Sequence, residues 1–138
     1  MKLLGKEDLL TQKFKIEEVD LGDDTFVCIR EMSGKDRNSY ENAFIKPVKK
    51  GKDLDYDYSI DGYKARLAIL CLCDQEGNKL FDLRDLDKFS EAISAARLAI
   101  IFEAAQKLNG LSDQVQEDML KNLEAVQDGN SNSDSVEN

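Results

Sequence analysis

The chain has 138 residues, of which 41% are hydrophobic and 34% charged, and its formal net charge is −9. A chain of this length can bury a core without help from disulfides or metals. The acidic balance argues against nucleic acid as a partner, because phosphate contact needs clustered Lys and Arg. No apolar run approaches the roughly 20 residues of a transmembrane helix, so we expect no membrane contact.

The residue types that are missing argue against catalysis. The chain has no His, which removes the usual general base near neutral pH and the commonest metal ligand. It also lacks a nucleophile elbow, a phosphate-binding loop and a dinucleotide fingerprint. The three cysteines, Cys28, Cys71 and Cys73, are an odd number, which favours reduced thiols in a cytoplasm. We therefore expect a cytoplasmic protein that is not an enzyme and has no cofactor or metal.

The N-terminal third predicts a helical turn followed by a β-hairpin. Residues 7–11 favour a short helical turn, and two runs rich in strand-forming residues, 16–21 and 25–32, flank a Gly-Asp-Asp turn. Such runs around a short turn are typical of a β-hairpin. Ser33 is then a candidate N-cap for a helix in which Tyr40, Ala43 and Phe44 share one face, and Pro47 ends that helix.

Residues 46–61 form a charged insertion with two open interpretations. Aspartates at positions 53, 55, 57 and 61 have the spacing of a calcium loop, but Tyr58 replaces the Gly and Lys64 replaces the final Glu that such a loop requires. Calcium binding is therefore not expected. An apolar face alternates with the aspartates and favours an edge strand beside the N-terminal hairpin, while an irregular loop fits equally well. That face consists of Leu54, Tyr56, Tyr58 and Ile60.

The second half of the chain predicts helices. Asp61 caps a buried helix with the body GYKARLAILCLC, where Cys71 and Cys73 act as small hydrophobic residues rather than metal ligands. A turn, a short helix over 83–89 and a long helix over 90–110 follow, and Asn109-Gly110 stops the long helix. Ser112 caps a last helix, whose apolar stripe is Val115, Met119, Leu120 and Leu123.

These elements predict an α+β fold that is mostly α-helical. An N-terminal β-hairpin is followed by four to five helices in one compact domain, residues 1–126. Residues 127–138 carry one apolar side chain and no Lys or Arg, so we expect a flexible acidic tail.

The order of the elements resembles that of the tail assembly chaperones of long-tailed bacteriophages and prophages. The likeness covers residues 3–125 and rests on three short motifs taken together. The first begins a helix and uses Arg30, Met32, Ser33, Gly34 and Arg37. The second ends a helix and uses Asp74, Gly77, Leu80 and Phe81. The third closes the long helix and uses Ala105, Leu108, Asn109, Gly110 and Leu111.

The resemblance implies a non-enzymatic role with defined partners. Members of this family keep the long helical tape measure protein soluble in the host cytoplasm, help to recruit the major tail tube protein and are absent from the mature virion. Self-association is also expected. The alternative is a small cytoplasmic adaptor or a structural tail subunit.

Grooves between helices suit an amphipathic partner helix, which binds through anchors at i, i+3 and i+4 spacing. The apolar stripe of the long helix offers such anchors or else forms the core, and the sequence does not separate the two. The expected partner-binding residues are Leu98, Ile101, Phe102, Ala105 and Leu108.

Overall fold

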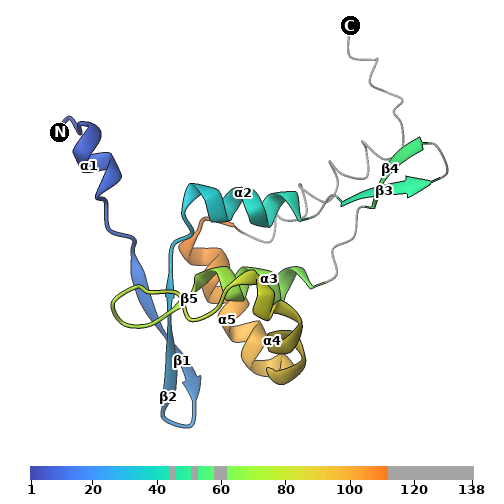
Figure 1. The fold of residues 1–138 in the computed structure, drawn as a ribbon. Helices are drawn as coiled ribbons and strands as arrows, with labels where there is room; N and C mark the ends of the chain where they lie inside the picture. The colour runs from blue at the N-terminus through green and yellow to red at the C-terminus, as the bar shows by residue number, and fades with distance from the viewer. Residues whose placement is uncertain (44–45, 51–52, 58–61, 112–138) are drawn as a thin grey trace, which may run out of the picture.

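A computed structural model describes residues 1–43, 46–50, 53–57 and 62–111, and in it helices pack around a small antiparallel sheet (Figure 1). The helices are α1 (Lys6–Leu10), α2 (Gly34–Asn42), α3 (Tyr63–Cys71), the 3-10 helix η1 (Leu83–Asp85), α4 (Leu86–Ala92) and α5 (Ala95–Leu108). The strands are β1 (Ile16–Gly22), β2 (Thr25–Arg30), β3 (Lys46–Lys50), β4 (Asp53–Asp57) and β5 (Leu72–Cys73). The predicted α+β fold class, with an N-terminal hairpin followed by helices, is confirmed.

The predicted N-terminal hairpin is present and has a tight turn. Gly22 pairs with Thr25, so only Asp23 and Asp24 form the loop, with φ of 52° and 61°. Positive φ at both central residues is the geometry of a type I′ turn, whose twist matches that of the strands, and Asp tolerates it better than most residues. The turn follows from the local sequence, which explains why the hairpin could be predicted.

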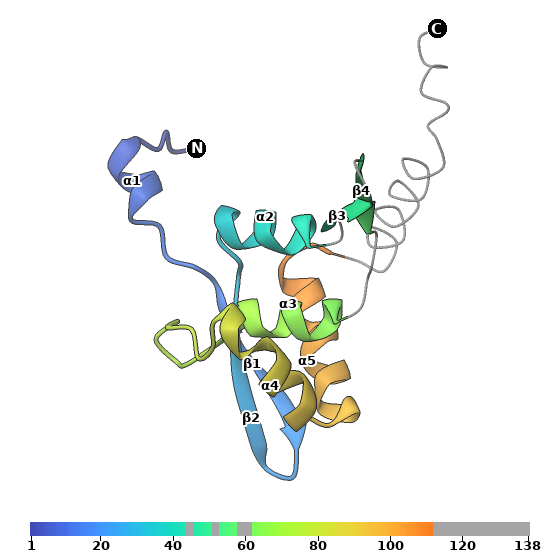
Figure 2. The ribbon, with the colours of Figure 1, turned by 45° about the vertical axis from the view of Figure 1, so that its right-hand side comes forward.

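Helix α3 lies at the centre of the core. Six of its nine residues are buried, and it packs against α5, α4 and α2. Ile29 of β2, Tyr40 of α2 and Ala105 of α5 are each 0% exposed around it. The turned view shows α4 and α5 beside the β1–β2 hairpin (Figure 2). Within the described segments, no helix combines the length and the apolar character needed to cross a bilayer.

Residues of the first and third motifs are hydrogen-bonded to each other. Ser33 caps α2 by accepting a hydrogen bond from the Asp36 backbone N–H at 3.1 Å, as predicted. Asn109, directly after α5, accepts a hydrogen bond from the Met32 backbone N–H at 2.8 Å. Arg37 donates to the Asn109 carbonyl at 3.3 Å. The start of α2 and the end of α5 are thereby held together.

The single long helix predicted over 90–110 is wrong at its start, because the structure has a break between α4 and α5 there. In the structure α4 continues to Ala92, Ile93 is extended with φ −84° and ψ 142°, and α5 begins at Ala95. Ser94 is the N-cap and accepts from the Arg97 N–H at 3.2 Å. A β-branched residue followed by a capping serine favours this break, whereas the surrounding residues all favour helix.

The prediction that Cys71 and Cys73 both lie on a helix is also wrong. Helix α3 ends at Cys71, and Leu72–Cys73 form β5, in which Cys73 pairs with Cys28 and Leu72 with Ile29. Backbone pairing with β2 compensates the loss of helical hydrogen bonds. The predicted role of the cysteines as buried small hydrophobes is confirmed, because all three are free thiols with at most 5% exposure.

The charged insertion contains a second hairpin. β3 pairs antiparallel with β4, and Lys46 lies opposite Asp57 in the register. The strand interpretation thus holds for residues 53–57, but within the described residues β4 pairs with β3, and β5 is the third strand of the N-terminal sheet. Phe44, Tyr58, Ile60 and Asp61, the helix expected from Ser112 and the tail 127–138 lie outside the described residues.

Candidate partner-binding groove

An open apolar groove of about 520 Å³ lies between the hairpin, the segment after β5 and the α4–α5 junction. Its floor consists of Leu72, Phe89 and Ile101, which are 3%, 8% and 2% exposed. Its walls are half-buried: Leu21 and Val27 from the inner face of the hairpin, Phe81, and Ile93 at the helix junction. Leu80, Ala92, Ser94 and Arg97 form its exposed rim.

The second motif builds one wall of this groove. Asp74 holds a turn, because its carboxylate accepts from the backbone N–H groups of Glu76 and Asn78, both at 2.9 Å. These hydrogen bonds, with the one from the Asn78 side chain, hold the pKa of Asp74 below its usual value. The turn returns the chain so that Phe81 packs against Phe89, with ring centroids 5.2 Å apart. Leu80 is then left 53% exposed beside the groove.

The groove has the chemistry of a binding surface rather than a reaction centre. Among the described residues that line it, the only hydroxyl belongs to Ser94, whose oxygen accepts the capping hydrogen bond of α5. The only ionisable side chain among these described residues is that of Arg97, at the rim. An apolar floor with few polar groups is suited to apolar side chains of a ligand or partner.

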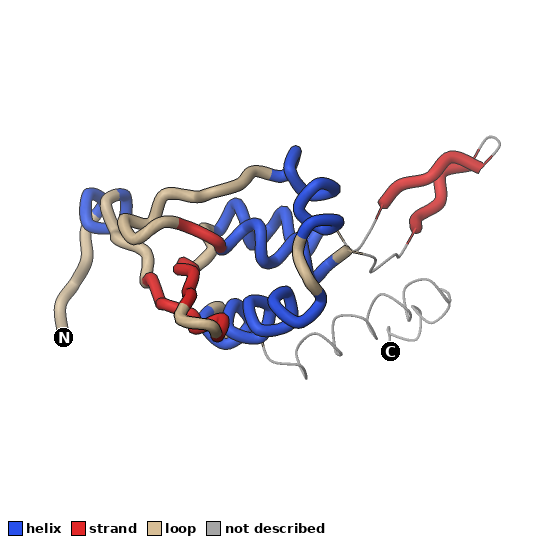
Figure 3. The backbone as a smooth tube through the Cα atoms, turned by 90° about the horizontal axis from the view of Figure 1, so that it is seen from below, coloured by secondary structure: helices blue, strands red, loops and turns tan. Residues whose placement is uncertain are grey.

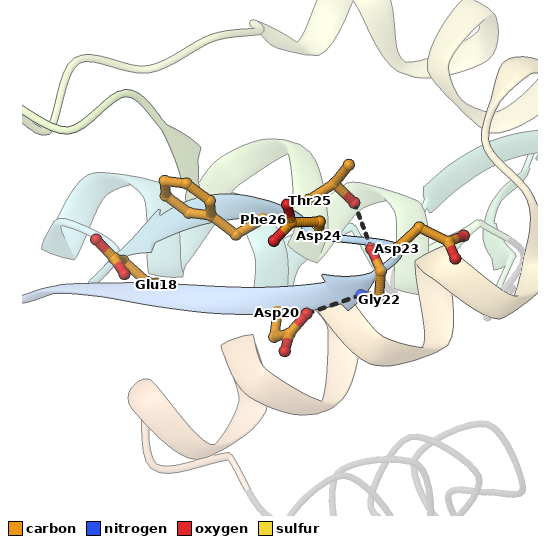
Figure 4. Close-up of a pocket in the computed structure, with 7 residues that line it drawn as sticks. All are labelled: Glu18, Asp20, Gly22, Asp23, Asp24, Thr25 and Phe26. Atoms are coloured by element: carbon orange, nitrogen blue, oxygen red, sulfur yellow. Dashed lines mark hydrogen bonds between the residues drawn. The ribbon is translucent and has the colours of Figure 1, made fainter.

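The outer face of the hairpin carries a different, acidic concavity of about 490 Å³ (Figure 4). Glu18, Asp20, the two turn aspartates and Phe26, which is 51% exposed, are among the residues that line it. The carboxylate of Asp20 accepts from the Gly22 N–H at 2.8 Å and so fixes the turn. Among the described residues, no three or more His, Cys, Asp or Glu side chains are grouped to hold a metal ion.

The five residues predicted to bind a partner lie mainly in the core. Ile101, Phe102 and Ala105 are buried, at 2%, 7% and 0% exposure, and Leu98 and Leu108 are half-buried. Phe102 makes an edge-to-face contact with Tyr63 of α3 at 5.5 Å. Only Ile101 also lines the groove. Sequence reasoning missed the exposed groove residues Leu80, Ala92 and Arg97, although Leu80 belongs to the second motif.

The three thiols are not suited to catalysis. Burial raises the pKa of Cys71 from 9.0 to about 12 and also raises the pKa values of Cys28 and Cys73. A thiol must ionise to act as a nucleophile or metal ligand. At neutral pH these side chains are therefore apolar core groups.

No family model matches this chain, and no curated protein matches it. Among solved structures, that of the bacteriophage HK97 tail assembly chaperone is similar, with a TM-score of 0.51 and 16% sequence identity. The match covers 74% of this chain and 94% of that chain. The resemblance predicted from the motifs is thus confirmed at the level of the fold: this chain has the fold of the HK97 tail assembly chaperone.

Proposed function

We propose that this protein is a phage tail assembly chaperone without enzymatic activity. The observation that carries the proposal is the structural match, which spans 94% of the HK97 chaperone although only 16% of the residues are identical. The apolar groove supports it, because it offers a surface for an apolar partner. Such a protein acts in the cytoplasm of the bacterial host.

The proposed client is the tape measure protein of the same phage. The groove binds an amphipathic helix of that protein through the apolar floor of Leu72, Phe89 and Ile101, while the net charge of −9 keeps the complex soluble. The complex then recruits the major tail tube protein, and the chaperone is left out of the finished virion. Of the other stripe residues of α5, Phe102 and Ala105 are buried in the core, and Leu98 and Leu108 are half-buried.

Co-expression with the tape measure protein tests this function. The wild-type chaperone is expected to move that protein from the insoluble to the soluble fraction and to copurify with it. Leu80→Glu places a charge at the groove rim, where 53% exposure makes the fold tolerant, and is expected to abolish both effects. Ile100→Glu is the matched control, because Ile100 is 38% exposed, does not line the groove, and the substitution adds the same charge.

Two outcomes contradict the proposal. If the wild-type protein neither binds nor solubilises the tape measure protein, the chaperone function is wrong. If Leu80→Glu and Ile100→Glu behave alike while circular dichroism shows both folded, the groove is not the binding surface. Mass spectrometry of purified virions separates the chaperone from a structural tail subunit, since only a subunit remains in the particle.

A further inference from the structure

Cys28 and Cys73 lie directly opposite each other on neighbouring strands of the N-terminal sheet. In the antiparallel pairing of β2 with β5, Cys28 is the register partner of Cys73, and Ile29 is the partner of Leu72. Directly opposite residues project from the same face of a sheet, with Cβ atoms about 4.5–5.5 Å apart. Both cysteines are free, so the register places two unbonded thiol side chains next to each other.

The pair lies on the face of the sheet that is turned away from the core. Side chains alternate between the two faces of a strand. Ile29 and Leu72, the neighbours of the two cysteines in the chain, belong to the hydrophobic core, so Cys28 and Cys73 project from the other face. Figure 3, with helices in blue and strands in red, shows the helical body on one side of the N-terminal strands. The thiol pair is therefore separate from the core contacts of the helices.

The two thiols affect each other's ionisation. Burial, and then the charge of the Cys28 thiolate, raise the pKa of Cys73 above 9.0. Burial also raises the pKa of Cys28, and the carboxylates of Glu18, Asp74 and Glu76 raise it further. A thiolate at one position thus disfavours a thiolate at the other, as expected for two sulfur atoms that lie close together.

The strand geometry is compatible with a disulfide. Opposite residues in an antiparallel pair have Cα atoms about 4.5 or 5.5 Å apart, within the range of about 4.4–6.8 Å that disulfides span. Their Cβ separation is at or slightly above the roughly 3.5–4.5 Å of a relaxed disulfide, so a bond draws β5 towards β2. A disulfide under such strain forms under oxidising conditions and is reduced again easily.

We propose that Cys28 and Cys73 form a reversible disulfide site that cross-links β2 to β5 under oxidising conditions. The oxidant is a small disulfide such as oxidised glutathione. The thiolate of one cysteine attacks it, which forms a mixed disulfide and releases one glutathione thiolate. The second cysteine then attacks the protein sulfur of the mixed disulfide and releases the other glutathione. The protein thiols lose two electrons to the oxidant, and their two protons pass to the released glutathione thiolates.

The bond fastens the two strands that carry the apolar groove. Val27 and Leu72, each next to one of the two cysteines in the chain, line the groove on the other face of the sheet. The cross-link also encloses residues 29–72, so it restricts the unfolded chain and stabilises the fold. Oxidation is therefore expected to fix the wall and the floor of the groove relative to each other.

Cys71 does not take part in the bond. It is the last residue of α3 and is 0% exposed, and its sulfur accepts a hydrogen bond from the Asn109 amide at 3.4 Å. Although Cys71 is only two residues from Cys73, it belongs to the helical core and has no cysteine opposite it among the described strands. It therefore serves as the internal control.

Refolding in a glutathione redox buffer tests the inference. The unfolded chain exposes every thiol to the reagent, so burial in the native protein does not limit the exchange. The refolded protein is quenched with acid, its free thiols are alkylated, and the linked peptides are identified by mass spectrometry. We expect one bond, Cys28–Cys73, with Cys71 alkylated, and a urea midpoint above that of the reduced protein.

Cys71→Ala is the matched control and is expected to keep the bond and the higher urea midpoint. Cys28→Ser and Cys73→Ser are each expected to lose both. A folded wild-type protein that keeps three free thiols in an oxidising buffer overturns the inference, and so does a bond that includes Cys71 or joins two molecules. The wild-type result does not depend on the folding of any variant. No tail protein takes part, so the outcome does not bear on the proposed chaperone function.

Discussion

Asn109→Ala is expected to destabilise the domain by about 2 kcal/mol, because it leaves a buried backbone donor without a partner. The Asn109 oxygen accepts from the Met32 N–H at 2.8 Å, and Met32 is only 9% exposed. The Asn109 amide also donates to the Ala105 carbonyl at 2.9 Å. The backbone of Asn109, with φ −97° and ψ 7°, accepts alanine without strain. The whole effect therefore comes from the lost hydrogen bonds.

Urea unfolding followed by circular dichroism measures this loss. The midpoint is expected to fall with an unchanged m-value, and the thermal midpoint to drop by roughly 8 °C for a domain of this size. Asn78→Ala is the control, because the Asn78 amide makes an exposed hydrogen bond to Asp74 at 3.2 Å. Its substitution is expected to cost less than about 0.5 kcal/mol. Equal effects of the two substitutions would show that Asn109 does not anchor α2 to α5.

Three further predictions concern the turns and the thiols. Gly77→Ala is expected to lower the free energy of unfolding more than Gly22→Ala. Both glycines have φ near +90°, but only at Gly77 does an added Cβ lie 3.1 Å from the Ile16 side chain. Urea unfolding of the two variants measures the difference. At about pH 8, the three cysteines of the native protein are expected to react slowly with a thiol reagent, because they are buried. In the unfolded protein all three are expected to react rapidly. Burial raises the pKa of Cys71 from 9.0 to about 12. Between these pH values the folded thiol keeps its proton and the unfolded thiol loses it. The free energy of unfolding is therefore expected to fall as pH rises above about 9. Cys71→Ala is expected to flatten that decline, and an unchanged pH dependence in this variant would contradict the assignment.

Elements with local signals could be predicted from the sequence. The hairpin follows from a two-residue Asp-Asp turn between strand-forming runs, and α2 follows from the Ser33 cap. The end of α5 follows from Asn109-Gly110, where Gly110 has φ of +70°. In each case residues close in sequence supply the decisive hydrogen bond or backbone conformation.

Elements that depend on tertiary pairing could not be predicted. Leu72 and Cys73 continue an apolar helical run in the sequence, and they become a strand only because β2 lies beside them. The break at Ile93 is hidden between two stretches that both favour helix. Sequence periodicity reports which face of an element is apolar, and it does not report which neighbour covers that face.

The same limit explains why the sequence pointed to the apolar stripe of α5 and not to the groove. The stripe from Leu98 to Leu108 is regular because it packs on α3 and the sheet, and regularity is what periodicity detects. The groove instead combines residues from the hairpin, from the segment after β5 and from the α4–α5 junction, so no single period describes it.

Within the second motif, the two parts have different physical roles. Asp74 and Gly77 make the turn, and Gly77 approaches Ile16 so closely that a side chain is not accommodated without movement. Phe81 packs on Phe89, whereas its neighbour Leu80 stays 53% exposed and adds little to the stability of the isolated domain. Because Leu80 adjoins the groove, its exposed side chain extends a contiguous apolar surface, which is typical of an interaction site. Leu80→Ser is therefore expected to leave the urea midpoint unchanged and to weaken the proposed binding to the tape measure protein. A large loss of stability in this variant would place Leu80 in the core and remove the strongest sign of a docking surface.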